Sequence, residues 1–335
     1  MNDQSSLKQL GAIFGTGRSG STWLGAIINS HPDVAYRFEP FHRLQRKNQE
    51  IAKVINHLKS GLISEQGVLE IYDLLLPAYP EIEKPPFFPK NFALGIGKGQ
   101  NLLWPLSRKI NIFNHLFKQL YTPRQKPLLI FKEVGYIEVP KILVQQTTIP
   151  IVYMMRHPCA VISSVIKGQN QSIMSTGRIP VLGNLLQKYE PNLAEKYHHE
   201  LDNMTIYEKQ ALLWFIEVEQ SFLSFQGYAN GLVIFYEELV NNTLPMAEKV
   251  LTHFGLSLDQ QVTEFIEESI KPPSSKAWFK EFGIRNNYFT VYRDSKKGLD
   301  KWKNDILPEE QKKIFNIVKD SQAFQWGVDL GLWNV

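Results

Sequence analysis

One glycine-rich segment, FGTGRSGSTWLG, constrains the fold of this chain more than any other feature. It spans residues 14–25, overlaps the end of the apolar run QLGAIFG and leads into the amphipathic stretch WLGAIINS. A buried strand, a glycine-rich turn and a helix, in that order, place backbone N–H groups and a helix N-terminus around a bound anion. The segment therefore predicts a phosphate-binding loop in an α/β protein.

The residues within the loop differ from those of nucleotide hydrolases. Gly15 and Gly20 keep the usual spacing, but Ser21 occupies the position of the expected lysine, and the cation has moved forward to Arg18. A hydrolase loop relies on that lysine and on a magnesium ion. We therefore expect a phosphate-like ligand that loop amides, hydroxyl groups and one arginine can hold without a metal.

Further along the chain, buried strands alternate with helices. Four runs rich in Ile, Val, Leu and Phe do not alternate with polar residues, which is typical of parallel strands buried on both faces. They lie at 11–15, 127–134, 149–155 and 231–237, and helical patterns cover 21–30, 105–120, 159–168, 204–226, 243–254, 259–270 and 308–320. We predict one domain over 1–335 of the α/β class: a P-loop-type parallel sheet flanked by helices, with helical insertions at about 43–126 and 169–203 and a lid at about 271–303.

Composition excludes several classes of protein. The formal net charge of +4 is too small to argue for a nucleic-acid partner, and the single cysteine, Cys159, excludes a disulfide framework or a cysteine metal cluster. The N-terminus, MNDQSSLKQL, lacks the basic start and apolar run of a signal peptide. We expect a cytoplasmic protein without a bound metal.

A second anion-binding pattern lies in YMMRHPCAVISSVI, residues 153–166. Arg156 ends a predicted strand, and Pro158 suits the first turn of the helix that follows. Ser164 lies about two turns into that helix, where its hydroxyl can face back toward the strand end. An arginine fork and a hydroxyl there suit a second phosphate. The alternative is that Arg156 pairs with a surface carboxylate.

Together these segments resemble sulfotransferases that use 3′-phosphoadenosine-5′-phosphosulfate (PAPS). GTGRSGSTWL resembles the loop that binds the 5′-phosphosulfate, and RHPCAVISS resembles the segment that binds the 3′-phosphate. The arginine-first form RSGST is closer to carbohydrate sulfotransferases than to the cytosolic steroid and phenol enzymes. VIFYEEL (233–239) resembles the segment whose tyrosine lies near the adenine, and KKGLDKWKNDIL (296–307) resembles the C-terminal lid. The resemblance extends from about residue 11 to 325.

The resemblance implies a set of donor-binding residues and no metal. Arg18 would stabilise the charge that develops on the departing phosphate. In the lid, the spacing from Gly298 to Trp302 is shorter than in the cytosolic enzymes. The residues implied to bind PAPS are Gly17, Arg18, Ser19, Gly20, Ser21, Thr22, Trp23, Arg156, Ser164, Tyr236, Lys296, Lys297 and Gly298.

The base that activates the acceptor hydroxyl departs from the cytosolic pattern. Those enzymes use a histidine two residues after a strand lysine; Lys132 matches the lysine, but Val134 occupies the histidine position. YRFEPFH (36–42) resembles the segment that supplies a glutamate base in some bacterial and Golgi-type carbohydrate sulfotransferases, which implies Glu39. Glu133 is the rival candidate. His31 and His42 are further options, which we expect to be partly exposed loop histidines.

The segment from Lys84 to Lys132 contains nine Lys or Arg residues and no Asp or Glu. Within it Leu106, Ile110, Phe113, Phe117 and Leu120 are spaced to share one face of a helix. This pattern fits either a helix that packs on the core or a surface for an anionic or amphiphilic acceptor. We therefore expect a hydroxyl acceptor on a carbohydrate, a glycolipid or a small molecule, with contact to a membrane surface through 84–132.

Two other functions fit parts of the sequence. A nucleotide-dependent phosphotransferase on the same fold would need the missing lysine and a strand-end aspartate for magnesium, so Ser21 argues against it. A non-catalytic nucleotide-binding module would not need so complete a loop. An O-sulfotransferase that takes its sulfuryl group from PAPS remains the leading hypothesis.

Overall fold

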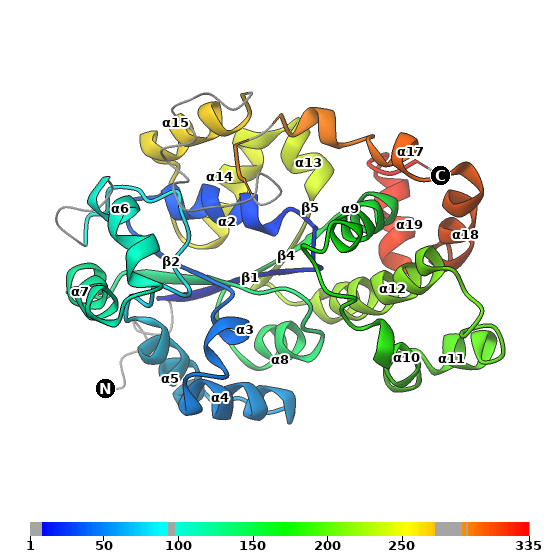
Figure 1. Cartoon of the computed structure of the whole chain (residues 1–335), viewed down its shortest axis with the longest axis horizontal. Helices are drawn as coiled ribbons and strands as arrows, with labels where there is room; N and C mark the ends of the chain where they lie inside the picture. Colours follow the sequence, from blue (N-terminus) through cyan, green and yellow to red (C-terminus); the bar gives the residue numbers. More distant parts are fainter. Residues whose placement is uncertain (1–8, 93–97, 272–289, 293, 335) are drawn as a thin grey trace.

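The computed structural model describes residues 9–92, 98–271, 290–292 and 294–334. Its sheet has five parallel strands in the order β2-β3-β1-β4-β5, with helices on both faces (Figure 1). The strands are β1 (Leu10–Gly15), β2 (Val34–Phe38), β3 (Leu128–Lys132), β4 (Ile151–Met155) and β5 (Gly231–Phe235). The predicted α/β fold with a parallel sheet is confirmed.

The edge strand β2 was not among the four predicted strands. Its sequence, VAYRF, pairs with β3 from Val34↔Leu128 to Phe38↔Lys132. The charged Arg37 hides the strand pattern, yet its side chain is buried because the guanidinium donates to the Leu75 and Leu76 carbonyls and pairs with Glu83 at 2.7 Å. Groups distant in the sequence therefore make this strand compatible with burial.

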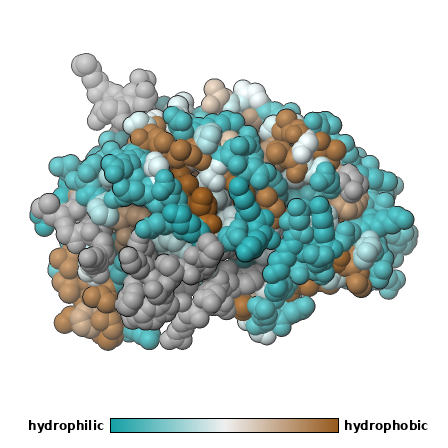
Figure 2. All heavy atoms as spheres, turned by 90° about the horizontal axis from the view of Figure 1, so that it is seen from above, coloured by the Kyte–Doolittle hydropathy of each residue, from teal (hydrophilic) through white to brown (hydrophobic). Residues whose placement is uncertain are grey.

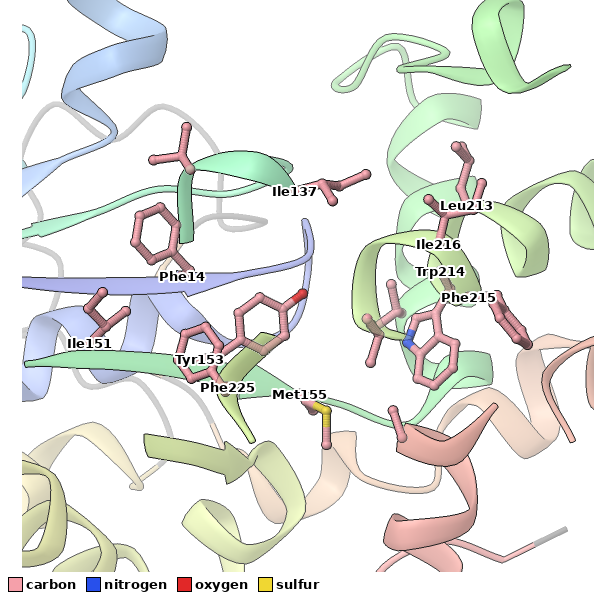
Figure 3. Packing of buried hydrophobic residues seen from close by; sticks show 14 of the residues in the cluster. Phe14, Ile137, Ile151, Tyr153, Met155, Leu213, Trp214, Phe215, Ile216 and Phe225 are labelled. Carbon is pink, nitrogen blue, oxygen red and sulfur yellow. The ribbon is translucent and has the colours of Figure 1, made fainter. Parts of the chain in front are cut away.

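Both faces of the sheet are covered by apolar packing. Alternate residues of β1 belong to different clusters: Ala12 and Phe14 pack on one face and Ile13 on the other. Figure 3 shows part of the first cluster, in which Phe14 and Tyr153 lie on neighbouring strands and Trp214 approaches from a helix. This two-sided burial explains why the strands read as continuous apolar runs.

The helices that cover the sheet match most of the helical predictions. On one face lie α2 (Ser21–Ser30), α13 (Tyr236–Asn241), α14 (Thr243–His253) and α15 (Gln260–Ser269); on the other lie α8 (Glu138–Gln146) and α12 (Ile206–Phe225) (Figure 1). Thr205 and Glu208 form a capping box that begins α12. The other well-predicted helices are α9 (Pro158–Asn170) and α18 (Pro308–Val318), and α19 (Gln322–Asp329) follows them.

The predicted insertions are helical. The helix α3 (Pro40–Leu44) begins just before the first insertion, which contains α4 (Gln49–Lys59), α5 (Glu65–Leu75), α6 (Lys98–Ser107) and α7 (Asn111–Tyr121). The second contains η1 (Ile179–Val181), α10 (Leu182–Tyr189) and α11 (Pro191–Tyr197). In the described part of the chain, no helix is both long enough and apolar enough to cross a membrane.

The single helix predicted over 105–120 is wrong. The chain forms α6 and α7, which pack against each other, and residue 110 between them is extended. This hairpin brings Trp104 and Phe117 into one buried cluster with Tyr121. Consequently the predicted apolar face does not exist as one surface, because Phe117 is buried whereas Leu106 and Leu120 are exposed.

The predicted lid at 271–303 falls partly outside the described residues, because 272–289 and 293 are not described. Its described part includes η3 (Lys296–Gly298) and α17 (Trp302–Asp305). These elements lead into α18 and α19, which lie beside α9 and α12 (Figure 1).

Candidate active site

The predicted site residues follow the carboxyl ends of the five strands. In a parallel sheet these ends meet at one edge, where open α/β sheets bind their ligands. The sheet order gives a row along this edge: Glu39 after β2, Glu133 after β3, the glycine-rich loop after β1, Arg156 after β4 and Tyr236 at the end of β5. Residues more than 200 positions apart in the sequence therefore belong to one edge.

The glycine-rich loop is shaped by close contacts at one glycine and open space at another. Gly20 has φ 96° and begins α2, and a Cβ there would lie 2.3 Å from the Tyr236 ring. At Gly17 a Cβ would meet no atom within 4 Å. The Ser19 hydroxyl is buried and has no hydrogen-bond partner among the described residues. A buried hydroxyl without a protein partner beside open backbone suits the binding of an anion.

Arg18 connects the loop to the β4–α9 segment. Its Nε donates to the Ser164 hydroxyl at 3.0 Å, and its carbonyl accepts from Arg156 Nη1 at 3.1 Å. This hydrogen bond directs the Ser164 hydroxyl of α9 toward the glycine-rich loop. The two arginines and the serine thus form one hydrogen-bonded group.

Arg156 lies between an aromatic ring and a carbonyl of the C-terminal segment. Its guanidinium carbon is 4.3 Å from the centre of the Tyr236 ring, and Nη2 donates to the Gly298 carbonyl at 3.4 Å. Lys296 and Lys297, which precede Gly298, are exposed, and the Lys297 ammonium is 3.4 Å from Asp294. Gly298 therefore reaches the group around Arg156 through its backbone, while the two lysines extend into solvent.

Tyr236 is held in place by Trp23 and Gly20. The Trp23 ring meets the Tyr236 ring edge to face at 6.3 Å, and its indole N–H donates to the Ser269 hydroxyl at 3.1 Å. Trp23 is buried in the core cluster with Tyr236. Its observed contacts pack it against Tyr236, and the contact with a donor that the resemblance implies for Trp23 stays a prediction.

Glu39 and Lys132 form an ion pair on the other side of the loop. Lys132 Nζ is 2.7 Å from Glu39 Oε1, and Arg43 is 3.4 Å from the second carboxylate oxygen. Burial by itself would raise the pKa of Glu39, but Lys132 and then Arg43 lower the pKa to about 2. The side chain of Glu39 retains 20% exposure, so this ionised carboxylate is accessible.

Glu133, the rival base, supports the backbone around Glu39. Its fully buried carboxylate accepts the N–H of Phe41 at 2.5 Å and the ring N–H of His42 at 2.6 Å. Burial raises the pKa of Glu133, and the hydrogen bond to Glu133 raises that of His42 against the opposing effect of burial. Glu39 is therefore the accessible carboxylate of the two, and Glu133 holds α3.

His31 does not have the exposure expected from the sequence. It is buried, its Nε2 lies 3.2 Å from the Ser257 carbonyl, and burial lowers its pKa. Its contacts come from distant parts of the chain, Ser257 at the ring and Lys90 at the carbonyl, so the local sequence does not reveal its burial. His42 is partly exposed as expected, with 44% of its side chain exposed, but it lies in the helix α3 rather than in a loop.

Three cations surround the ring of Phe38, next to Glu39. Arg43, Lys84 and Lys132 lie 4.6, 4.6 and 4.9 Å from its centre. A small cavity is lined by Lys84 and Phe38 together with Thr22 of the loop helix. Arg43 and Lys84 were not predicted as site residues. The segment without acidic residues that starts at Lys84 pointed toward Lys84, whereas no sequence signal pointed toward Arg43.

Two predicted catalytic residues have unusual backbone conformations. Among the described residues other than glycine, positive φ occurs at Arg18 (72°), Glu39 (52°) and Ser172 (56°). Such conformations are unfavourable for residues with a Cβ and concentrate at functional sites. Arg18 and Glu39, two of the three residues predicted to be catalytic, therefore have unfavourable backbone conformations at the same sheet edge.

Other parts of the described chain show no competing metal centre. No group of three or more His, Cys, Asp or Glu side chains among the described residues is placed to hold a metal ion. A cleft of about 800 Å³ between α4 and α5 is lined by residues such as Glu50, His57 and Glu70. None of the predicted site residues lines this cleft.

Three solved structures resemble this fold. The sulfotransferase domain from the Synechococcus PCC 7002 olefin synthase is 15% identical, with 97% of this chain and 95% of that chain covered and a TM-score of 0.48. Mouse sulfotransferase SULT7A1 complexed with PAP is 13% identical, with 98% and 92% covered and a TM-score of 0.48. Retinol dehydratase in complex with retinol and PAP is 17% identical, with 94% and 81% covered and a TM-score of 0.43.

The family assignment rests on the sequence match. No curated protein matches this sequence significantly. The model of the sulfotransferase domain family matches residues 12–326, which is nearly the whole chain. The phosphate-binding loop, the Arg156 segment and the Glu39–Lys132 pair all lie within that range. The chain therefore belongs to the sulfotransferase family.

Proposed function

We propose that this sulfotransferase moves a sulfuryl group from PAPS to an acceptor hydroxyl, with Glu39 as the base. The observation that carries the proposal is the row of groups along the sheet edge. The loop with Arg18 lies after the central strand β1, with Arg156 and Tyr236 on one side and Lys132 and Glu39 on the other. Donor and acceptor would then bind on opposite sides of the loop.

The donor side suits a nucleotide that carries a phosphate at each end of its ribose. The loop amides and the buried Ser19 hydroxyl would bind the 5′-phosphosulfate. Arg156 and Ser164 would bind the 3′-phosphate, and the Tyr236 ring, already in contact with Arg156, would border the adenine. The hydrogen bond between Arg18 and Ser164 links the two phosphate positions.

The transfer is an in-line displacement at sulfur. The acceptor oxygen forms a bond to sulfur as the bond from sulfur to the 5′-phosphate oxygen breaks, and the acceptor proton passes to the Glu39 carboxylate. The products are a sulfate ester and adenosine 3′,5′-bisphosphate. Arg18 would stabilise the negative charge that accumulates on the departing phosphate.

Lys132 would couple the strength of the base to the presence of donor. In the structure it pairs with Glu39, whose pKa of about 2 makes the carboxylate ionised but weakly basic. An anionic sulfuryl group beside Lys132 would compete for the same ammonium. The pKa of Glu39 would then rise, and the carboxylate would accept a proton more readily when donor is bound.

The acceptor side suits an anionic molecule. Arg43 and Lys84 contribute two positive charges beside Lys132, and the nearby Glu133 carboxylate is hydrogen-bonded to His42. We therefore propose a carbohydrate or glycolipid acceptor that carries a carboxylate, phosphate or sulfate near its reacting hydroxyl.

Calorimetry with adenosine 3′,5′-bisphosphate, ATP and GTP tests the donor assignment. We expect selective binding of the bisphosphate, and Arg156→Ala should reduce that preference strongly because it removes a charged hydrogen-bond donor. Turnover of PAPS with neutral and anionic glycans then tests transfer. Equal binding of ATP and the bisphosphate in the unaltered protein would contradict the proposal and favour a phosphotransferase.

A further inference from the structure

The helix α7 presents apolar residues on two adjacent faces. Phe117 and Tyr121 point into a buried cluster with Trp104. Ile112, Leu116 and Leu120 recur at four-residue intervals and are 72%, 40% and 52% exposed. The inward face accounts for the packing of this helix, so the outward stripe needs a separate explanation.

The neighbouring helix α6 extends this exposed surface. Leu102 and Leu106 are also four residues apart and exposed, and Ile110 is exposed at the connection between the helices. Figure 2 shows a brown surface at its lower left, on the side where Figure 1 places α6 and α7. We call this surface the hairpin patch; its residues are Leu102, Leu106, Ile110, Ile112, Leu116 and Leu120.

Positive charges accompany the hairpin patch. Lys109, Arg124 and Lys126 are exposed, and the sequence from Lys84 to Lys132 contains no acidic residue. Lys90 and Lys132 lie elsewhere, because Lys90 binds the carbonyls at the end of α2 and Lys132 pairs with Glu39. Lys109 lies between α6 and α7, and Arg124 and Lys126 follow the end of α7, so these exposed cations adjoin the hairpin patch along the chain.

We propose that the α6–α7 hairpin docks on an anionic membrane surface. The hairpin patch would enter the boundary between headgroups and acyl chains, while the cations contact lipid phosphates. A second copy of this chain is a poorer occupant, because a symmetric contact would bring Lys109, Arg124 and Lys126 of both copies together. An anionic lipid surface complements both the apolar and the basic character.

The hairpin borders the acceptor side of the active site. Trp104 of α6 donates its indole N–H to the Glu83 carbonyl at 3.0 Å. The next residue, Lys84, lies 4.6 Å from the centre of the Phe38 ring, over which Lys132, the partner of Glu39, also lies. If the proposed sulfuryl transfer is correct, a docked hairpin would present hydroxyl groups of membrane amphiphiles to Glu39.

Vesicle flotation tests the docking directly and requires no donor. We expect the full chain to bind vesicles of phosphatidylcholine mixed with phosphatidylglycerol, to bind phosphatidylcholine alone far more weakly, and to dissociate partly in high salt. Two triple variants should each reduce vesicle binding at least tenfold. Ile112→Ser/Leu116→Ser/Leu120→Ser removes apolar side chains from the patch. Lys109→Glu/Arg124→Glu/Lys126→Glu removes three cations, each of which contributes about fivefold to binding near an anionic surface.

Matched variants control for general effects of polarity and charge. Leu62→Ser/Leu307→Ser/Leu330→Ser alters three exposed leucines elsewhere, and Lys249→Glu/Lys271→Glu/Lys312→Glu reverses three exposed lysines elsewhere. Both should bind vesicles as the unaltered protein does. Thermal melting and bisphosphate binding of every variant establish that it is folded.

Three results would overturn the proposal. In the first, the hairpin variants bind vesicles as tightly as the unaltered protein. In the second, the control variants lose as much vesicle binding as the hairpin variants. In the third, sedimentation shows that the unaltered protein is a dimer and that the triple serine variant is a monomer. Because the flotation assay is performed without PAPS, a protein that does not bind vesicles would leave the donor assignment intact. Likewise, absent turnover with normal flotation would contradict only the proposed chemistry.

Discussion

At the scale of single residues, Lys132 is the group that sets the properties of Glu39. The two side chains meet at 2.7 Å, and Glu39 adopts φ 52° at the start of α3. A positive φ at a residue that has a Cβ raises the free energy of the folded state by about 1–2 kcal/mol, which surrounding contacts must offset. The backbone N–H of Glu39 donates to the Lys132 carbonyl, so the lysine residue stabilises both the position and the charge of the carboxylate.

Replacing Lys132 should move the acidic limb of the pH–rate profile. Transfer needs ionised Glu39, so activity falls as pH drops through the pKa of this group. Lys132→Gln removes the main charge that holds this pKa at about 2, and the limb should move up by about one to three pH units. The profile of kcat/KM against pH measures the change.

Two further variants test whether Glu39 is the group that titrates in that profile. Arg43→Gln should move the limb less, because Arg43 contacts Glu39 at 3.4 Å and is partly exposed. Glu39→Gln should depress turnover strongly and remove the limb while bisphosphate affinity stays nearly constant. An active Glu39→Gln beside an inactive Glu133→Gln would reverse the assignment of the base.

At the scale of elements, the loop between β1 and α2 contains two glycines with different roles. Gly20→Ala would place a methyl group 2.3 Å from the Tyr236 ring at φ 96°, so we expect a loss of stability of about 2 kcal/mol or more. Gly17→Ala meets no atom within 4 Å and should melt like the unaltered protein, yet bind bisphosphate more weakly. Thermal melting and calorimetry separate the two effects. A Gly17→Ala protein that is destabilised more than Gly20→Ala would contradict this division.

The elements that sequence reasoning missed depend on distant partners. The strand β2 was missed because the charged Arg37 interrupts its apolar residues. The partners that make this charge compatible with burial, in α5 and at Glu83, lie far away in the sequence. The single helix predicted over 105–120 became a hairpin because Trp104 and Phe117 pack in one cluster. Helical periodicity within a segment cannot show where that segment folds back on itself.

At the scale of the whole molecule, His157 links the sheet edge to the C-terminal segment. It follows Arg156, stacks on Trp302 at 4.4 Å and lies 3.2 Å from the Asn334 carbonyl. Burial lowers its pKa from 6.5 to about 4. Between these values the unfolded chain binds a proton that the folded chain does not. The contribution of His157 to the free energy of unfolding is therefore fully retained above pH 6.5 and is lost progressively as pH falls toward 4.

The variant His157→Phe should flatten this part of the stability curve. Phenylalanine keeps the stacking surface for Trp302 but cannot bind a proton. The unfolding free energy should then fall less steeply on acidification between pH 4 and 6.5, by about 1.4 kcal/mol per pH unit. Denaturant unfolding at several pH values measures this change in unfolding free energy. The variant His198→Phe, at an exposed histidine, is the control. An unchanged slope would mean that His157 does not account for the acid sensitivity.

The sequence by itself determined the parts of this protein that depend on local pattern. Glycine spacing around Arg18 predicted the loop, apolar runs predicted four of the five strands, and the Arg156–Ser164 spacing predicted two groups that converge. These features need only neighbouring residues, because backbone geometry relates positions a few residues apart.

Only the tertiary structure decided the surroundings of these groups. It placed Glu133 beneath α3 and left Glu39 accessible beside Lys132. It also gathered Arg43 and Lys84 around Phe38, and it turned one stripe of α7 inward and the other outward. The burial and the pKa of each site residue depend on side chains from distant strands and helices. These properties are therefore established only when the strands pair in their final order.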